Sequence, residues 1–321
     1  MKAIRIYTPG DEAAMKLEEV AAPEPAAGQA IVQHEAIGVN YIDIYFRQGL
    51  YKAPESPYGI GMEGAGRVVK LGEGVTQVKV GDRVAYAMQR GSYAEQTAVP
   101  AWMLVPVPEL MDAKTAASLM LQGMTVHYLV HDSYHLKAGE TCVVHAAAGA
   151  LGLLLCQVAK MKGATVIGTA SSAERQARAK EFGADHVCGY DDFVKLTKEV
   201  TGGKGAHVVY DSVGATTFLP SLDCIRPRGT MVTFGNASGP VPAIEPLVLA
   251  QKGSLFLTRP TLATHCQSRD EVLGRAYDVF SWKMVRGMKL VIDGEYALGA
   301  AAQAHADLAG RRTSGKLLLI P

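Results

Sequence analysis

The chain has 321 residues, of which 48% are hydrophobic and 20% are charged, and its formal net charge is +1 at pH 7. This length exceeds one ordinary hydrophobic core, so we expect two domains. Charged residues are spread along the whole sequence without a basic stripe or an acidic tail, which argues against nucleic-acid binding and against a charged docking arm.

The N-terminal sequence and the cysteines favour a cytoplasmic protein without membrane association. The opening MKAIRIYTPGDE is typical of an alternating strand and a Pro-Gly turn, not of a signal or transit peptide. The most apolar helical stretch, residues 150–161, is too short to span a bilayer. The 5 cysteines are scattered and include no CxxC pair, as is usual in a reducing compartment.

Short alternating runs separated by glycine turns fill the first third of the chain. Strands are predicted over 30–34, 66–71 and 82–86, with turn signals at 72–74 and 80–82. This pattern predicts an antiparallel barrel or sandwich.

From residue 141 the pattern changes to strands that alternate with helices. Strands are predicted over 142–147, 165–169, 186–188, 207–211, 230–234 and 254–258, and helices over 151–162, 172–182, 192–201 and 216–224. Such alternation predicts an α/β domain with a doubly wound parallel sheet and helices on both faces. A long helix over 269–287 follows, and the apolar end 316–320 is expected to return to the sheet of the first domain.

The sequence HAAAGALG (145–152) joins the first of these strands to its helix with few side chains. In a dinucleotide-binding fold, this turn places helix N-terminal amides against a pyrophosphate, whose charge the helix dipole favours. The usual GxGxxG motif here runs from Ala147 to Gly152, with alanine for the first glycine. Gly149 would let the backbone approach the ligand, and Gly152 would let helix and sheet pack closely. Such small residues also occur for packing alone, but the βα units that follow favour a coenzyme site.

The end of the second strand predicts a preference for NADP(H). NAD-binding units usually carry an acid there, which binds the ribose hydroxyls. Residues 168–172 contain no acid, and Arg175 follows one turn later. We expect Ser171 and Arg175 to bind the 2′-phosphate, because a hydrogen bond to a charged group contributes about 1.5–3 kcal/mol. A capping box of Ser171 and Glu174 with a solvated Arg175 is the alternative, and the two interpretations are compatible.

Seven stretches carry a resemblance to one family: AIGVNYIDIYFRQGLY (36–51), GMEGAGRVVKLGEGVTQVKVGDRVAY (61–86), HAAAGALG, VVYDSVG (208–214), FGNASG (234–239), KGSLFLTRP (252–260) and RRTSGKLLLIP (311–321). The chain resembles, nearly end to end, the NADPH-dependent quinone oxidoreductases, the zeta-crystallin-like branch of the medium-chain dehydrogenase/reductases. Zinc-dependent relatives carry cysteine where this chain has Asn40, and histidine where it has Met62 before Glu63. Because Asn and Met are poor zinc ligands, the resemblance implies chemistry without a metal.

The resemblance also implies the architecture and the reaction. Residues 1–123 would form the first part of a GroES-like β-barrel catalytic domain, 124–262 a Rossmann NADP-binding domain, and 263–321 the return to the catalytic domain. NADPH in the cleft between the domains would reduce a small-molecule quinone by hydride transfer, in one two-electron step or by single electrons. The strand over 254–258 would lie at the sheet edge, where strands invite pairing, so a homodimer is expected.

The residues expected at the site are those that match the family's motifs. Asn40, Tyr45, Tyr51 and Arg259 are the candidates for contact with the quinone or the nicotinamide. The coenzyme would be bound by Asn40, Thr125, Gly149, Ala150, Leu151, Ser171, Arg175, Tyr190, Ser212, Phe234, Gly235, Asn236 and Arg311. Structural roles stay open: a turn residue for Asn40, a helix cap for Thr125 and an ion pair for Arg259. Each tyrosine also fits a half-buried aromatic.

Other patterns and functions are weaker. Residues 310–316 fit GxxxxGK, but the few residues left leave no room for the helix of a phosphate loop. His127, His131 and His135 are four apart, but Gly139 indicates that the helix ends before the third, so no metal site is expected. The rival functions are an NADPH-dependent alkenal or enone reductase on the same scaffold and a non-catalytic, zeta-crystallin-like binding or structural protein. The near-neutral charge argues against RNA as its partner.

Overall fold

The computed structural model describes residues 1–53 and 56–321, and these fall into two compact units. Unit 1 comprises Met1–Met124, His265–Val285 and Leu290–Pro321, and unit 2 comprises Thr125–Thr264 and Arg286–Lys289. Within these described ranges, every helix is too short or too polar to cross a membrane.

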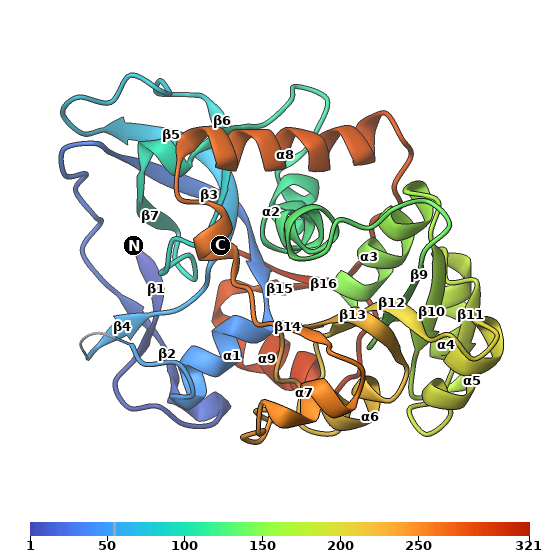
Figure 1. Ribbon diagram of the computed structural model, residues 1–321. Coiled ribbons are helices and arrows are strands. Elements are labelled where there is room, and N and C mark those ends of the chain that lie inside the picture. The colour runs from blue at the N-terminus through green and yellow to red at the C-terminus, as the bar shows by residue number, and fades with distance from the viewer. Residues whose placement is uncertain (54–55) are drawn as a thin grey trace. The chain divides into compact units, whose positions relative to one another are not determined.

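Unit 2 contains a parallel sheet with the strand order β11-β10-β9-β12-β13-β14 (Figure 1). The strands are β9 (Thr141–Val144), β10 (Thr165–Thr169), β11 (His186–Cys188), β12 (Ala206–Asp211), β13 (Ile225–Thr233) and β14 (Phe256–Thr258). Counted from β9, this is the order 3-2-1-4-5-6 of the Rossmann fold. The predicted doubly wound sheet is confirmed, and β14 lies at a sheet edge as expected.

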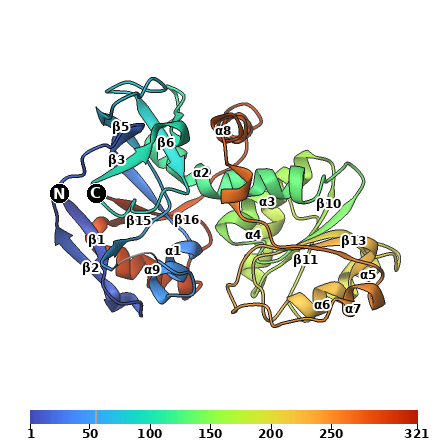
Figure 2. The ribbon, with the colours of Figure 1, turned by 60° about the vertical axis from the view of Figure 1, so that its left-hand side comes forward.

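Helices cover both faces of this sheet (Figure 2). α3 (Ala150–Met161) and α4 (Ala173–Glu181) lie on one face, and α5 (Phe193–Val200), α6 (Phe218–Leu222) and α7 (Leu247–Gln251) lie on the other. Apolar side chains such as Val143, Phe193 and Phe218 fill the second face. Right-handed crossovers require this distribution, because the chain first moves outward to β11 and then returns toward β14.

Several element boundaries differ from those predicted; β9, for example, ends at Val144 rather than at residue 147. α6 is shorter than 216–224, and β13 begins at Ile225 rather than at residue 230. The Pro-Arg-Gly sequence 227–229 resembles a turn signal, although the strand continues through it. α8 (Arg269–Met284) ends before residue 287, where Gly287 has a φ of +71° that a helix does not accept.

Unit 1 is built on a mostly antiparallel sheet with the order β15-β16-β3-β5-β6-β8, in which β7 also pairs with β3. Its strands are β3 (Gln29–Val39), β5 (Glu63–Leu71), β6 (Arg83–Ala87), β7 (Gln96–Pro100), β8 (Val105–Pro106), β15 (Ile292–Ala297) and β16 (Lys316–Ile320). Another sheet has the order β2-β1-β4, from β1 (Lys2–Ile6), β2 (Met15–Glu19) and β4 (Tyr58–Gly59). β16 pairs with β3, so the C-terminal segment returns to this sheet as predicted.

Three further helices lie next to the strands and segments that hold residues of the candidate site. α1 (Tyr41–Gln48) directly follows β3, and α9 (Ala301–Ala309) precedes β16. α2 (Ala113–Tyr128) contains the boundary between the units, and a π-helical turn, Leu129–Ser133, follows it.

In unit 2, α3 packs against the turn that precedes it. Ala146 has a φ of 51°, and its carbonyl accepts a hydrogen bond from Gly149 N–H at 2.9 Å. A Cβ atom on Gly152 would lie 2.2 Å from the Ala146 carbonyl oxygen and 2.8 Å from Ala147 Cα. A side chain does not fit there, so Gly152 sets how closely α3 approaches the turn.

We expect Gly152→Ala to destabilise the protein by about 1–3 kcal/mol, because the added methyl group overlaps backbone atoms. Gly274→Ala is the matched control, since Gly274 is exposed within α8 and an added Cβ would meet nothing within 4 Å outside its own helix. It should gain about 0.5–1 kcal/mol. Urea unfolding followed by circular dichroism measures both, and equal stability of the two variants would contradict the close packing at Gly152.

Candidate functional site

The amides at the start of α3 are accessible to a ligand. Gly149 caps the helix with extended backbone, and Leu153 N–H donates the first helical hydrogen bond to the Gly149 carbonyl at 2.8 Å. The N–H groups of Ala150 and Leu151 precede that bond and therefore point out of the positive end of the helix. Gly149, Ala150 and Leu151 are all partly exposed. The backbone of this turn thus offers donors to an anion.

The alanine at the first motif position is accommodated by a glycine in the neighbouring strand. A Cβ atom on Gly168 of β10 would lie 2.8 Å from Ala147 Cβ. Ala147 N–H also donates to the Thr169 carbonyl at 2.9 Å. Gly168 therefore provides the room that the methyl group of Ala147 takes, and the turn stays close to the sheet.

The end of β10 carries the residues expected for a 2′-phosphate. Ser171 is exposed, and Arg175 lies half-buried in the first turn of α4. The cap of α4 is Ser172, which still has extended backbone and whose Oγ accepts from Arg175 N–H at 3.3 Å. The alternative capping box of Ser171 with Glu174 is therefore wrong, because the helix begins one residue later than that box requires.

Tyr190, in the loop after β11, contacts a buried histidine next to the turn. The ring centroids of Tyr190 and His145 are 6.2 Å apart, and the rings are inclined by 29°. Burial lowers the pKa of His145 to about 4, so its ring is neutral near pH 7. Tyr190 therefore contacts the residue that directly precedes residues 146–152, the glycine-alanine turn.

The loops after β12 and β13 also meet. Asp211 ends β12, and its buried carboxylate accepts from the N–H groups of Val213 and Gly214 at 2.7 and 3.1 Å. A Cβ atom on Gly235 would lie 2.3 Å from the Ser212 carbonyl oxygen. Ser212 therefore lies against the turn formed by residues 234–236, which brings these predicted coenzyme residues together.

The five loops follow strands that are neighbours in the sheet, in the order β11-β10-β9-β12-β13. The strand order reverses between β9 and β12, the position at which open α/β sheets bind ligands. Accessible amides, small side chains and the absence of an acid in the sequence 168–172 fit a phosphorylated dinucleotide. The arrangement can bind NADP(H) at the carboxyl end of the sheet.

In unit 1, the side chain of Asn40 is held from opposite sides. Its Nδ2 donates to Glu63 Oε1 at 2.7 Å, and its Oδ1 accepts from Lys316 Nζ at 2.8 Å. Gln122 Nε2 also donates to Asn40 Oδ1, at 3.3 Å. Lys316 and Glu63 form a fully buried ion pair, and Leu121 N–H donates to Glu63 Oε2 at 2.7 Å. The amide oxygen of Asn40 therefore faces an ammonium group and its nitrogen faces a carboxylate.

A second chain of buried groups continues from the backbone of Asn40. Asp43 Oδ2 accepts from Asn40 N–H at 2.9 Å and from the Tyr93 hydroxyl at 3.1 Å. The Tyr93 oxygen lies 2.9 Å from His305 Nε2, and Arg47 donates to His305 Nδ1 at 3.4 Å. Burial raises the pKa of Asp43 to about 7 and lowers the pKa of His305 to about 3. A neutral His305 therefore donates to Tyr93 through Nε2.

The two predicted tyrosines lie within α1 and shortly after it, and Asn40 is the N-cap of this helix. Tyr45 lies within α1 and is 7% exposed, whereas Tyr51 follows the helix and is half-buried. Their ring centroids are 5.3 Å apart at an interplanar angle of 64°, and Tyr51 N–H donates to the Tyr45 carbonyl at 3.1 Å. The two rings thus pack against each other, and Tyr51 is the more exposed of the two.

Three other predicted residues lie in different elements. Thr125 is buried within α2, so the alternative role as a helix cap is wrong. Arg259 is exposed directly after β14. Arg311 follows α9 with a φ of 55° and is exposed; its N–H donates to the Leu308 carbonyl at 3.2 Å. Positive φ at a residue with a side chain is a strained backbone of the kind found at ligand sites.

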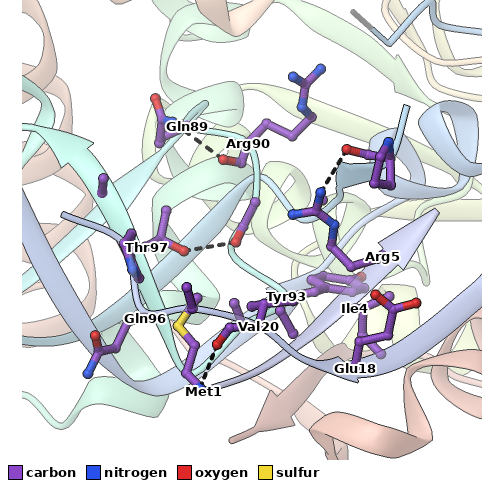
Figure 3. Close-up of a pocket in the computed structure, with 18 of the residues that line it drawn as sticks. Met1, Ile4, Arg5, Glu18, Val20, Gln89, Arg90, Tyr93, Gln96 and Thr97 are labelled. Atoms are coloured by element: carbon purple, nitrogen blue, oxygen red, sulfur yellow. Dashed lines mark hydrogen bonds between the residues drawn. The ribbon is translucent and has the colours of Figure 1, made fainter. Parts of the chain in front are cut away.

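A cavity of about 620 Å³ lies in unit 1, beside β1 and the segment around Arg90 (Figure 3). At its wall, the Met1 ammonium donates to the Val20 carbonyl at 2.8 Å and Arg5 donates to the Pro57 carbonyl at 2.9 Å. The lining does not include any residue predicted for the site. We therefore assign neither the coenzyme nor the quinone to it.

Across residues 1–53 and 56–321, no group of three or more His, Cys, Asp or Glu is arranged to hold a metal ion. The rings of His127 and His131 stack with centroids 4.5 Å apart, and His135 lies edge-on to His131 at 6.4 Å. α2 ends at Tyr128, so the regular helix does stop before His135.

Known proteins resemble the whole chain. An alcohol dehydrogenase GroES-like domain matches residues 26–109, and a zinc-binding dehydrogenase domain matches residues 150–269. The chain is 42% identical to the quinone oxidoreductase of Pseudomonas aeruginosa, over 100% of this chain and 99% of the relative. It belongs to the quinone oxidoreductase family.

Further members and neighbours agree. The structure of Escherichia coli quinone oxidoreductase complexed with NADPH has a TM-score of 0.97 at 40% identity, with both chains covered completely. A 2-haloacrylate reductase from a Burkholderia species is 38% identical over 95% of this chain and 94% of the relative. The predicted resemblance and the combination of a GroES-like and a Rossmann domain are confirmed.

Several buried polar residues beside the candidate site are not among those predicted for it, and four of them are Glu63, His145, Asp211 and Lys316. Two of them have a signal in the sequence. Lys316 begins the apolar run KLLLI, and Asp211 ends the apolar run HVVYD. A charge within a buried strand needs a partner, so each of these patterns indicates a buried polar contact.

We expect Lys316→Met to destabilise the protein by about 3–5 kcal/mol, because Glu63 would remain as a buried carboxylate without its cation. The double variant Lys316→Met/Glu63→Gln should recover most of that loss, since neither buried charge is then left unpaired. Chemical unfolding of the wild type, both single variants and the double variant gives the coupling free energy. Additive single effects would contradict the ion pair.

Proposed function

We propose that this chain is an NADPH-dependent quinone oxidoreductase that transfers hydride to a quinone without zinc. The observation that carries the proposal is the carboxyl end of the parallel sheet, where the open amides of Ala150 and Leu151 adjoin a strand end without an acid. Membership of the family and the NADPH complex of the E. coli relative support it.

The coenzyme preference follows from the charges at the end of β10. A carboxylate there would repel a 2′-phosphate, whereas Ser171 and Arg175 supply hydroxyl and guanidinium donors. Tyr190 would complete this phosphate site, and the amides of α3 would bind the pyrophosphate. Thr125, Ser212, residues 234–236 and Arg311 remain the further proposed coenzyme contacts.

Bound NADPH supplies the hydride. The protein orients the reactants, and Asn40 is suited to this because its amide direction is fixed by Glu63 and Lys316. The ring of Tyr51, packed against that of Tyr45, would contact a flat quinone, and Arg259 is the proposed partner of a quinone oxygen. The Asn40 amide oxygen already accepts from Lys316 and Gln122, and asparagine is a poor zinc ligand, which supports a reaction without zinc.

We also propose a homodimer formed through β14. This strand lies at the sheet edge, and Phe256 and Leu257 on it are 64% and 38% exposed. Unpaired backbone groups beside exposed apolar side chains favour pairing with a second copy.

One observation favours a second candidate function, the reduction of an enone. The chain is similar to a 2-haloacrylate reductase. Acrylates and enones both carry a carbon–carbon double bond conjugated to a carbonyl group, so a related site has a related acceptor.

We expect Arg175→Ala to weaken NADPH binding roughly 10–100-fold and to leave NADH binding nearly unchanged, since the lost hydrogen bond to the 2′-phosphate contributes about 1.5–3 kcal/mol. Lys180→Ala is the matched control, because it removes an exposed positive charge from the same helix. Fluorescence titration with each coenzyme measures the affinities. Unchanged NADPH affinity in Arg175→Ala would refute the phosphate assignment.

We expect the wild-type protein to oxidise NADPH faster with 1,4-benzoquinone than with an enone at matched concentration. The planar acceptor would stack on the half-buried ring of Tyr51, against which the buried ring of Tyr45 packs edge to face. Initial rates of NADPH oxidation measure the difference. Faster enone reduction would favour the second candidate, and binding of NADPH without turnover of either acceptor would favour a non-catalytic protein.

A further inference from the structure

The loops predicted to bind the coenzyme meet at a buried ring behind them, that of His145. This residue is 1% exposed and directly precedes the glycine-alanine turn. We propose that His145 is a positioning residue that sets the preference for NADPH over NADH, by holding the two 2′-phosphate loops against the pyrophosphate turn. This inference rests on the proposed function.

Both ring nitrogens of His145 are used, each toward a different element. The Ser221 hydroxyl donates to the Thr217 carbonyl at 2.7 Å, so it accepts from His145 Nε2–H, at 2.8 Å. Nδ1 of the neutral ring then accepts from the Thr169 hydroxyl at 2.9 Å. The ring therefore joins the end of β9 to the end of β10 and to α6 with fixed direction.

The faces and edges of the ring are also occupied. Tyr190 stacks on it with centroids 6.2 Å apart, and Phe193 of α5 lies edge-on at 4.7 Å. Thr169 is two residues before Ser171, the first phosphate candidate. The ring thus contacts the anchor of one 2′-phosphate loop and the aromatic residue of the other.

The pyrophosphate turn is held by bonds that do not use this ring. His145 N–H donates to the Tyr210 carbonyl at 3.0 Å, and Ala147 N–H donates to the Thr169 carbonyl at 2.9 Å. Replacing the side chain leaves these backbone bonds available. The amides that both coenzymes need should therefore stay in place, while the groups that only NADPH needs should shift.

The test compares two substitutions at this cluster with a matched one elsewhere. His145→Phe removes both side-chain bonds and keeps an aromatic ring, and Thr169→Val removes one bond with little change of shape. His34→Phe is the control, because His34 is also buried and bonded through both nitrogens, to the Ala94 carbonyl and the Tyr86 hydroxyl at 2.7 Å, but lies in unit 1. Fluorescence titration gives the Kd of NADPH and of NADH for each folded variant.

We expect the ratio of the NADH Kd to the NADPH Kd to fall roughly 10-fold in His145→Phe and roughly 3–5-fold in Thr169→Val, as the loss of two hydrogen bonds or one implies. His34→Phe should keep the wild-type ratio. If His145→Phe does not fold, Thr169→Val decides. An unchanged ratio at this cluster, equal weakening of both coenzymes, or the same shift in His34→Phe would overturn the inference.

The proposed function and this inference fail in different ways. A wild-type protein without preference for NADPH would refute the proposed coenzyme. A preference that is lost in Arg175→Ala but kept in His145→Phe and Thr169→Val would refute only the role of His145.

Discussion

The backbone contact between Ala146 and Gly152 is the constraint on which the coenzyme site depends. The chain must reverse between β9 and α3, and it does so with Ala146 at a φ of 51°, a conformation that costs about 1–2 kcal/mol for a residue with a side chain. The bond from Gly149 N–H to the Ala146 carbonyl compensates, and the absent side chain of Gly152 lets α3 begin directly against that carbonyl. The direction of the Ala150 and Leu151 amides follows from this contact. Binding of an anion here therefore depends on backbone packing rather than on charged side chains.

Much of the fold is predictable because its determinants are local. The alternation of apolar strands and helices from residue 141 predicts the parallel sheet, and the strand order then follows from short right-handed connections. The limits of elements are less predictable where local chemistry and tertiary pairing disagree. Residues 227–229 have the composition of a turn and form an irregularity within β13: β12 pairs with Ile225 and again from Thr230 onward, and Arg228 between them has a φ of 60°. α8 already ends at Met284 with Val285 as its cap, and Gly287 beyond it has a φ of +71°, which a helix does not propagate.

The same distinction applies to the site. The turn at 145–152 and the missing acid after β10 are contiguous features, so the sequence by itself is enough to propose the nucleotide site. The network around Asn40 cannot be proposed in this way, because Lys316 and Asn40 are 276 residues apart. What joins them is the register of β16 on β3, in which Leu317 pairs with Val39 and the next positions are Lys316 and Asn40. No periodic pattern contains that register. The pattern does show a lysine that precedes four apolar residues, and a buried lysine requires an anion nearby.

A buried ion pair such as Glu63–Lys316 is a poor source of stability, since apolar residues of similar volume are often at least as stable. Its effect on Asn40 is directional. A rotated Asn40 amide would place its NH₂ group against the Lys316 ammonium and its oxygen against Glu63, so both favourable contacts would become repulsive. The pair therefore selects one of two orientations that are equivalent in shape. Unit 2 achieves the same result without charge, because the bond from Ser221 to the Thr217 carbonyl decides which nitrogen of His145 carries the proton. In each unit a fully buried polar group, out of reach of solvent, fixes the orientation of a residue at the candidate site, and water cannot compete for its hydrogen bonds.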